Sequence, residues 1–157
     1  PAAFFAAALT QAFRARHRFR ALWREARRLG LNLLPPDVNL SEMEFSCEGP
    51  GAVRCGLMVI NGLGPEAFEE IATARRGLAF FDLADFVRRV DPGRVRPAVV
   101  ENLIRGGACD GFGLPRLSML RQAPIMLGAV RPRERRGGGA AEPLAFFDRP
   151  AHEWIPK

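Results

Sequence analysis

The residues best suited to bind a ligand are Gly-Leu-Gly-Pro at positions 62–65, which stand between an apolar stretch and an amphipathic one. Gly62 and Gly64 can adopt the positive φ values of a tight hairpin. Pro65 suits the first position of a helix, where its missing N–H costs nothing. Leu63 would then pack between the helices on either side of the hairpin. The free amides and the dipole at the start of the second helix predict an anion-binding site.

The expected donors to this anion are the backbone amides nearest the hairpin, those of Leu63, Gly64, Glu66 and Ala67. Pro65 has no N–H and cannot donate. The carboxylates of Glu66, Glu69 and Glu70 would repel an anion, so we expect them on the solvated side of the helix. The alternative interpretation is a plain turn between two helices, which is what most glycine turns are.

Side-chain contacts to the anion could come from five arginines: Arg75, Arg76, Arg94, Arg96 and Arg105. Arg94 and Arg96 are the strongest candidates, because they flank a second turn formed by residues 91–93. For each arginine taken alone, an ordinary solvated side chain is the alternative.

The net charge fits a polyanionic partner. The 157-residue chain carries a formal charge of +6, nearly all of it from arginine, since Lys157 is the single lysine. Arginine donates two parallel hydrogen bonds to phosphate, which favours nucleic acid as the partner. A compositional bias of the genome is the alternative explanation. Four arginines cluster at positions 14, 16, 18 and 20, where a neighbouring domain could also cover them.

The three cysteines predict neither a zinc site nor a disulfide framework, because their number is odd and none forms a CxxC pair. Cys47 and Cys55 could face each other across a small hairpin, but we expect reduced thiols in a cytoplasmic chain. The sequence also lacks an apolar run of about 20 residues, which a membrane span requires.

The remaining polar residues do not form a catalytic pattern. Asp37 and Asn39 follow two prolines, and such side chains usually bond their own backbone. His17 and His152 are isolated, and no nucleophile stands beside a base. The chain has no aspartate pair spaced like a two-metal polymerase site.

The spacing of apolar residues predicts a mainly helical protein with one small β-hairpin. Asp82 is expected to cap one of the helices. A weaker copy of the first helix-hairpin-helix unit is expected around residues 91–93. The predicted helices cover residues 1–13, 19–29, 65–76, 83–89, 96–105 and 114–122, and the predicted strands cover 44–48 and 53–56. A further helix is expected in the apolar stretch that begins at Leu57 and leads into the first hairpin.

Several motifs occur in one family's order and spacing. The runs LPPDVN-S, G-x-G and LI-GGA-D, within about residues 1–113, resemble the bacterial DNA polymerase III α subunit, in its replicative form or its error-prone paralogue. The match extends from the end of the fingers through the helix-hairpin-helix region. Two positions depart from the family. Asn61 stands where a lysine is usual, and Cys109 stands where an aromatic residue is usual.

The resemblance implies a tandem helix-hairpin-helix fold that binds duplex DNA without sequence preference and holds it behind the polymerase active site. It implies a parent that is a DNA-directed DNA polymerase, a nucleotidyltransferase that uses divalent metal ions such as Mg²⁺. The family's catalytic aspartates lie upstream, so we expect this piece to hold no cofactor and to be inactive alone. A bifunctional DNA glycosylase is disfavoured, because such enzymes need a lysine soon after the hairpin.

The resemblance also implies a domain layout and a second partner. We expect a fingers-like segment at 1–34, the hairpin domain at 35–127, a flexible linker at 128–142 and a tail at 143–157. The tail residues Leu144, Phe146 and Phe147 resemble a peptide that binds the sliding clamp, although the leading glutamine is missing. The alternatives are a tail packed on its own domain, or a scaffold between polymerase domains. We expect bacterial cytoplasm, near the nucleoid, as the location.

Overall fold

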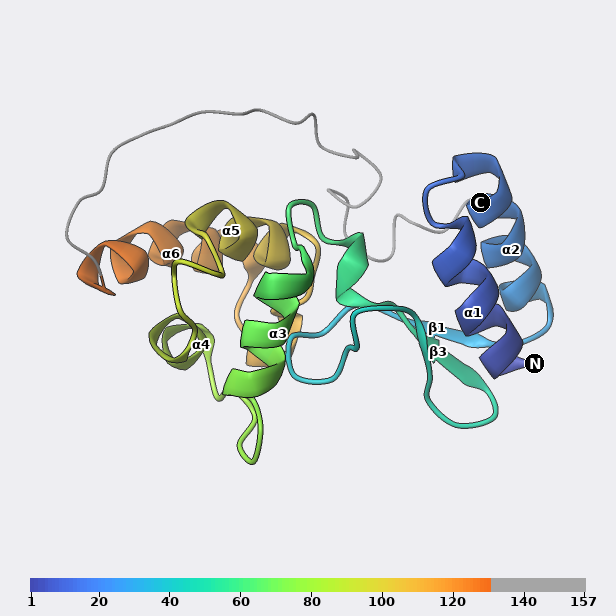
Figure 1. The fold of residues 1–157 in the computed structure, drawn as a ribbon, viewed down its shortest axis with the longest axis horizontal. Coiled ribbons are helices and arrows are strands. Elements are labelled where there is room, and N and C mark those ends of the chain that lie inside the picture. The colour runs from blue at the N-terminus through green and yellow to red at the C-terminus, as the bar shows by residue number, and fades with distance from the viewer. Residues whose placement is uncertain (131–157) are drawn as a thin grey trace.

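The computed structural model describes residues 1–130, which form six α-helices and a small three-stranded sheet. The helices α1 and α2 lie with the sheet at one end of the molecule, and α4, α5 and α6 lie at the other end (Figure 1). The mainly helical fold predicted from the sequence is therefore confirmed. The predictions for Leu144, Phe146 and Phe147 fall outside the described residues.

The first two helices form close to their predicted bounds, but the second begins at Arg16, three residues before its predicted start. Helix α1 covers Ala2–Ala12 and buries one face, with Phe5 and Leu9 at its centre. Helix α2 covers Arg16–Arg28, and the chain then leaves the helix at Gly30, whose φ of +79° favours glycine. The two helices pack against each other and against the sheet.

The sheet contains the predicted hairpin and one further strand. Strands β2 (Ser46–Cys47) and β3 (Ala52–Arg54) pair antiparallel, and β1 (Asn32–Leu34) joins the other edge of β3 in parallel. The strand order is β1-β3-β2. Cys47 lies opposite Val53 rather than Cys55. All three thiols are free, and burial raises the pKa of Cys55 to about 12.

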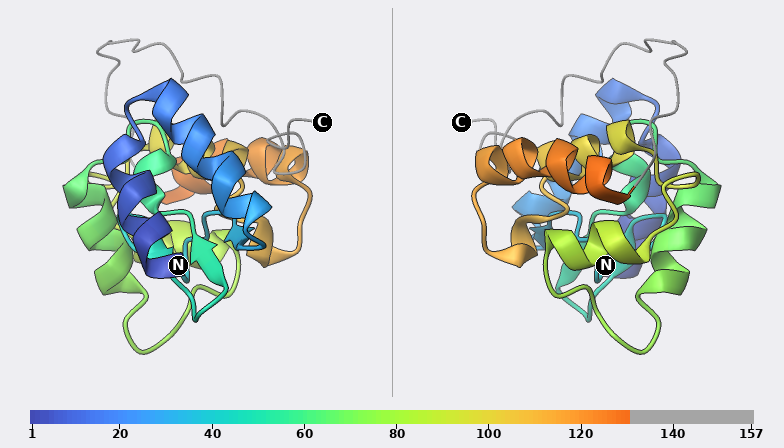
Figure 2. Two further views of the ribbon diagram at one scale, coloured as in Figure 1. Left: turned by 90° about the vertical axis from the view of Figure 1, so that its right-hand side faces the viewer. Right: turned by 90° about the vertical axis from the view of Figure 1, so that its left-hand side faces the viewer.

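The second half of the described chain contains four helices and two short hairpins, the first hairpin just before α3 and the second between α4 and α5. Helices α3 (Pro65–Ala74), α4 (Leu83–Arg89) and α5 (Pro97–Arg105) lie close to their predicted bounds. Helix α6 (Arg116–Val130) runs eight residues beyond its predicted end and continues through Pro124. It packs on α4 and α5 (Figure 2). Its last residues overlap the start of the segment predicted as a linker, and the rest of that segment lies outside the described residues.

One predicted helix is wrong. The segment before the first hairpin forms only a single turn of 3-10 helix, Leu57–Val59. The amides of Leu57 and Met58 donate to the carbonyls of Glu42 and Met43, at 2.8 and 2.9 Å. These contacts hold the segment against residues 42–43, and only seven residues separate the end of β3 from Gly62. The chain therefore has no room for a longer helix here.

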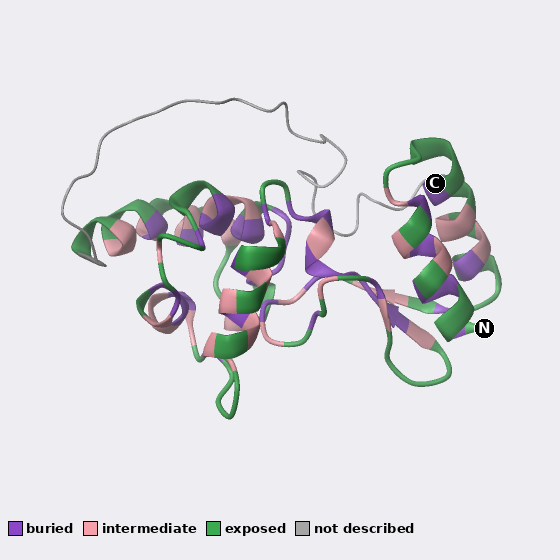
Figure 3. Ribbon diagram, viewed as in Figure 1, coloured by how far each residue is buried: buried purple, intermediate pink, exposed green. Residues whose placement is uncertain are grey.

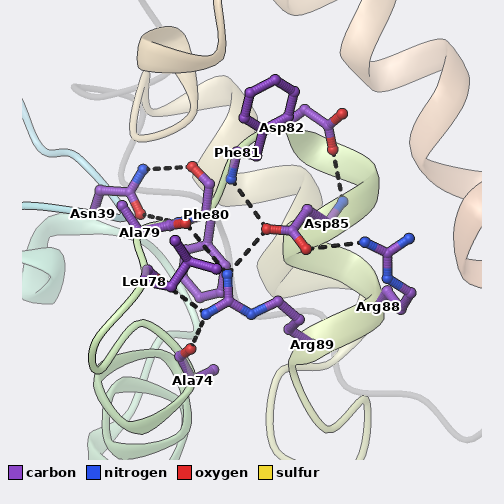
Figure 4. Close-up of polar contacts among 10 residues, drawn as sticks. All are labelled: Asn39, Ala74, Leu78, Ala79, Phe80, Phe81, Asp82, Asp85, Arg88 and Arg89. Atoms are coloured by element: carbon purple, nitrogen blue, oxygen red, sulfur yellow. Dashed lines mark hydrogen bonds and ion pairs between the residues drawn. The ribbon is translucent and has the colours of Figure 1, made fainter.

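The loop between α3 and α4, residues 75–82, is fixed by polar contacts (Figure 4). The Arg89 guanidinium donates to three backbone carbonyls of the preceding chain, those of Ala74, Leu78 and Ala79. Asn39 exchanges two hydrogen bonds with the backbone of Phe80, at 2.7 and 3.0 Å. Asp82 caps α4 by accepting from the Asp85 amide at 2.7 Å, as predicted. The loop thus sets the position of α4 relative to α3.

The buried apolar residues form one continuous cluster, and Figure 3 shows buried positions on the helices and the sheet. Ile71 of α3, Phe86 of α4 and Leu103 of α5 are fully buried, so the three helices share one core. Among the described helices, none is long and apolar enough to cross a membrane. Within residues 1–130, no group of three His, Cys, Asp or Glu side chains is placed to hold a metal ion.

Candidate functional site

The first hairpin has one left-handed glycine rather than two. Gly62 has a φ of +75°, as predicted. Gly64 has φ −94° and ψ 178°, an extended conformation that any residue can adopt, so the prediction of a positive φ is wrong there. Leu63 is buried between the elements on either side, as expected. Pro65 occupies the first turn of α3, also as expected.

The start of α3 offers three free backbone donors. Among the residues that the structure describes, the amides of Gly64, Glu66 and Ala67 have no hydrogen-bond partner. The Leu63 amide is already bonded, because it donates to the Ile60 carbonyl at 3.2 Å. The predicted donor set therefore loses Leu63 and keeps the other three amides.

The second hairpin is built by Asp91. Its carboxylate accepts from the Gly93 amide at 2.7 Å, and its carbonyl accepts from the Val95 amide at 2.8 Å. Val95 is fully buried, so it corresponds to the buried Leu63 of the first hairpin. Arg96 then occupies the N-cap position of α5 without a side-chain hydrogen bond, and Pro97 stands at the start of that helix.

The two hairpins correspond at a constant offset of 32 positions. The buried residue, the cap, the proline and two buried helix residues all repeat at this offset: Leu63 and Val95, Gly64 and Arg96, Pro65 and Pro97, Ala67 and Val99, Ile71 and Leu103. The prediction of a second, weaker copy is confirmed. The first-turn amide of Ala98 corresponds to that of Glu66, and it has no bonding partner within residues 1–130.

Each of the two helices also holds the hairpin of the other. Asn102 of α5 donates to the Asn61 carbonyl in the first hairpin at 2.9 Å. Glu70 of α3 accepts from the Asp91 amide in the second hairpin, also at 2.9 Å. Glu70 and Asn102 are themselves 32 positions apart. The contacts are reciprocal, so the two helix starts are held at a fixed separation.

The glutamates after the first hairpin differ in environment. Glu66 and Glu69 are exposed, as expected. Glu70 was expected on the solvated side, but it is half-buried because it binds the second hairpin. Sequence reasoning missed both Glu70 and Asn102 as hairpin-holding residues. The sequence does contain a signal for both residues, since each stands five residues after the proline that begins its helix.

Arg75 makes structural contacts within the described chain. Its guanidinium donates to the carbonyls of Val38 and Ser41, each at 2.8 Å, and lies over the Phe68 ring. Burial lowers the pKa of Arg75, and the charge of Glu42 opposes this shift. The side chain fastens α3 to the 38–41 turn, which gives Arg75 a structural role, and its role as a phosphate contact stays a prediction.

The other candidate arginines are accessible. Arg94 and Arg96 are exposed, and their side chains make no hydrogen bond or ion pair within the described chain. Both lie beside the start of α5. Arg76 and Arg105 are also exposed, but they stand at the C-terminal ends of α3 and α5, away from the hairpins.

The 37–41 turn bonds its own backbone, as predicted. The Asp37 carboxylate accepts from the Asn39 amide at 2.7 Å, and the Asp37 amide donates to the Ser41 hydroxyl at 2.9 Å. Asn39 has the additional role of holding Phe80. The isolated His17 is exposed on α2.

Comparison with known proteins agrees with this geometry. The model of the helix-hairpin-helix motif family matches residues 30–119. The DNA polymerase III subunit alpha of Caulobacter vibrioides is 33% identical over 88% of this chain and 12% of its own length. That of Vibrio cholerae is 37% identical over 76% of this chain and 10% of its own.

An error-prone DNA polymerase from Symbiobacterium thermophilum is also similar, at 35% identity over 90% of this chain and 15% of its own length. The chain thus spans only 10 to 15% of the length of these three relatives. The matched residues 30–119 contain both hairpins and the residues that hold them. The chain therefore belongs to the helix-hairpin-helix family and is similar to one segment of bacterial DNA polymerase III α subunits.

Proposed function

We propose that this chain binds the backbone of duplex DNA without sequence preference, through the amides that begin α3 and α5. The observation that carries the proposal is the reciprocal contact between the hairpins, which holds the three free amides at the start of α3 and the free Ala98 amide of α5 at a fixed separation. Helix starts attract phosphate through their free N–H groups and their dipole. Arg94 and Arg96 add positive charge beside the start of α5.

The proposed role is to hold the duplex behind the active site of a polymerase III α-type protein, in its replicative or its error-prone form, as a segment of a larger protein whose catalytic residues lie elsewhere. DNA polymerization, its divalent metal ions and the contacts to other polymerase domains would belong to that larger protein. Tethering to the sliding clamp through Leu144, Phe146 and Phe147 stays a prediction from the sequence.

The hairpins alone should bind weakly. Residues 29–130 carry ten arginines against twelve aspartates and glutamates, a formal net charge of −2. Glu66 and Glu69 stand exposed beside the free amides at the start of α3. If Arg94 and Arg96 each neutralise one phosphate, the affinity should fall with salt with a slope of only about −2 on logarithmic axes.

A Gly64→Val substitution should lower the affinity for duplex DNA about fivefold to tenfold. The Gly64 backbone is extended and a side chain there meets open space, so the fold should tolerate valine. The new side chain would cover the free amides and keep a phosphate away. Fluorescence anisotropy with a labelled duplex at fixed salt measures the effect.

The matched control is Gly51→Val. Gly51 also has open space around it and lies in the β2–β3 turn, away from both hairpins. We expect its affinity for duplex to equal that of the unsubstituted chain. Equal affinities for all three proteins would contradict the proposed function.

A further inference from the structure

The positive charge of this chain is not at the hairpins. Residues 14–28 contain seven arginines and one glutamate, a formal charge of +6, which equals the net charge of the whole chain. Residues 29–130, which include both hairpins, have a net charge of −2. The electrostatic attraction for a polyanion is therefore concentrated on α2 and the residues just before it.

Helix α2 separates its apolar and basic residues onto different faces. Phe19 and Ala26 are buried against α1 and the sheet, while Arg16, Arg24 and Arg27 are exposed. At about 100° per residue, these three arginines fall within an arc of about 80°. Arg20 is the only other α2 residue within that arc, so every residue on it is arginine.

These three arginines, the arginine face, have no acidic partner among the described residues. The single carboxylate of α2, Glu25, pairs instead with Arg28 at 2.8 Å. Helix α2 stands at the end of the molecule opposite α4–α6 (Figure 1), and its three arginines at positions 16, 24 and 27 are exposed. Helix α2 packs on α1 and β1, and these contacts hold it in place.

We propose that the arginine face binds the phosphates of one strand of duplex DNA, as a second contact separate from the hairpins. From Arg16 to Arg27 the helix rises about 16 Å, which matches the axial length of about five successive phosphates of one strand. Arginine suits this partner because its planar fork binds phosphate with two hydrogen bonds.

An acidic protein surface fits this face less well. Protein interfaces have an apolar core and are poor in charge at the centre. The arc that carries the arginine face contains no apolar residue. A nucleic-acid backbone needs only a row of regularly spaced positive charges.

The test is a charge-neutralising triple variant, Arg16→Gln, Arg24→Gln and Arg27→Gln, in the 157-residue chain. Glutamine is a good helix former, so α2 should persist. We expect at least a tenfold loss of affinity for a labelled duplex. We also expect the logarithmic salt slope to become shallower by about 3, since each lost phosphate contact removes about 0.9.

The matched control removes the same charge elsewhere, through Arg76→Gln, Arg105→Gln and Arg121→Gln. All three are exposed and make no side-chain hydrogen bond or ion pair in residues 1–130. We expect less than a threefold loss in this control. Equal losses in the two triple variants, or no loss in either, would overturn the proposal.

Three further arms complete the test. A variant with Arg16→Lys, Arg24→Lys and Arg27→Lys should keep most of the salt slope that the glutamine variant loses. Failure to keep it would count against a charge contact. Tighter binding of a single strand than of a duplex of the same length would overturn the assignment to duplex. Poly-glutamate binding as tightly as the duplex would assign the face to an acidic protein instead.

This proposal does not depend on the hairpins. Gly64→Val should lower affinity without changing the salt slope, because it removes no charge. The triple α2 variant should change the slope. The two contacts can therefore fail separately, and each failure has its own signature.

Discussion

A Gly56→Ala substitution is expected to lower the free energy of unfolding by about 3 kcal/mol or more. Gly56 is buried, and a Cβ atom there would overlap backbone atoms of Glu44 and Met43. Backbone cannot move aside as the end of a flexible side chain can. The same segment is bonded to residues 42–43 through Leu57 and Met58, so any shift would also break those hydrogen bonds. Urea denaturation followed by circular dichroism measures the change.

The control for this prediction is the same substitution at Gly64. That residue has an extended backbone and open space, so Gly64→Ala should change the unfolding free energy by less than about 1 kcal/mol. If both variants unfold at the same urea concentration, the close contact at Gly56 does not affect the free energy of unfolding, which contradicts the prediction. The same denaturation measurement on Gly64→Val shows whether that variant is folded when its DNA affinity is measured.

An Arg75→Met substitution is expected to cost about 3 kcal/mol of stability and to leave DNA affinity unchanged. Methionine keeps the apolar stem but leaves the carbonyls of Val38 and Ser41 without their donor. Both residues are almost fully buried, so water cannot readily replace the guanidinium. Denaturation measures the first effect, and anisotropy under conditions where the variant is folded measures the second.

The neighbouring Arg76→Met serves as the control. Arg76 is exposed and its side chain is unpaired within the described chain, so we expect a change of less than about 0.5 kcal/mol. A loss of DNA affinity in folded Arg75→Met, with Arg76→Met unchanged, would show that Arg75 contacts the ligand after all. It would contradict the structural role assigned to it.

The features that sequence reasoning predicted correctly are controlled by neighbouring residues. Asp82 caps α4 through an amide three residues away, and Pro65 and Pro97 begin their helices through their own fixed φ. Gly62 adopts the positive φ that its own turn requires. Such signals act within one or two turns of chain, so they can be seen in the sequence without knowledge of the tertiary structure.

The features that sequence reasoning missed depend on contacts between distant segments. Strand β1 pairs with β3 across about 20 residues, and Arg75 finds its carbonyl partners more than 30 positions earlier. The 3-10 turn at 57–59 replaces a predicted helix because residues 42–43 bond to it. In each case a residue far away in the sequence determines the local structure, and a single sequence does not identify that residue.

The distribution of charge shows why an overall composition can mislead. The net charge of +6 favours nucleic acid as a partner, and the glycine hairpin predicts where a phosphate would bind. The structure separates the two features, because the charge lies on α2 and the hairpins lie in a segment of net charge −2. Hairpin amides would fix where a phosphate sits, whereas arginines would supply most of the attraction.

The most direct test of the central claim, that the hairpin amides bind the duplex, is a nuclear magnetic resonance titration of the ¹⁵N-labelled chain with a short duplex. The amide signals of Gly64, Glu66, Ala67 and Ala98 should shift progressively as duplex is added, because these groups have no partner within the described structure. The Leu63 amide, already bonded to Ile60, should shift less. Shifts confined to α2, with the four hairpin amides unchanged, would contradict the claim.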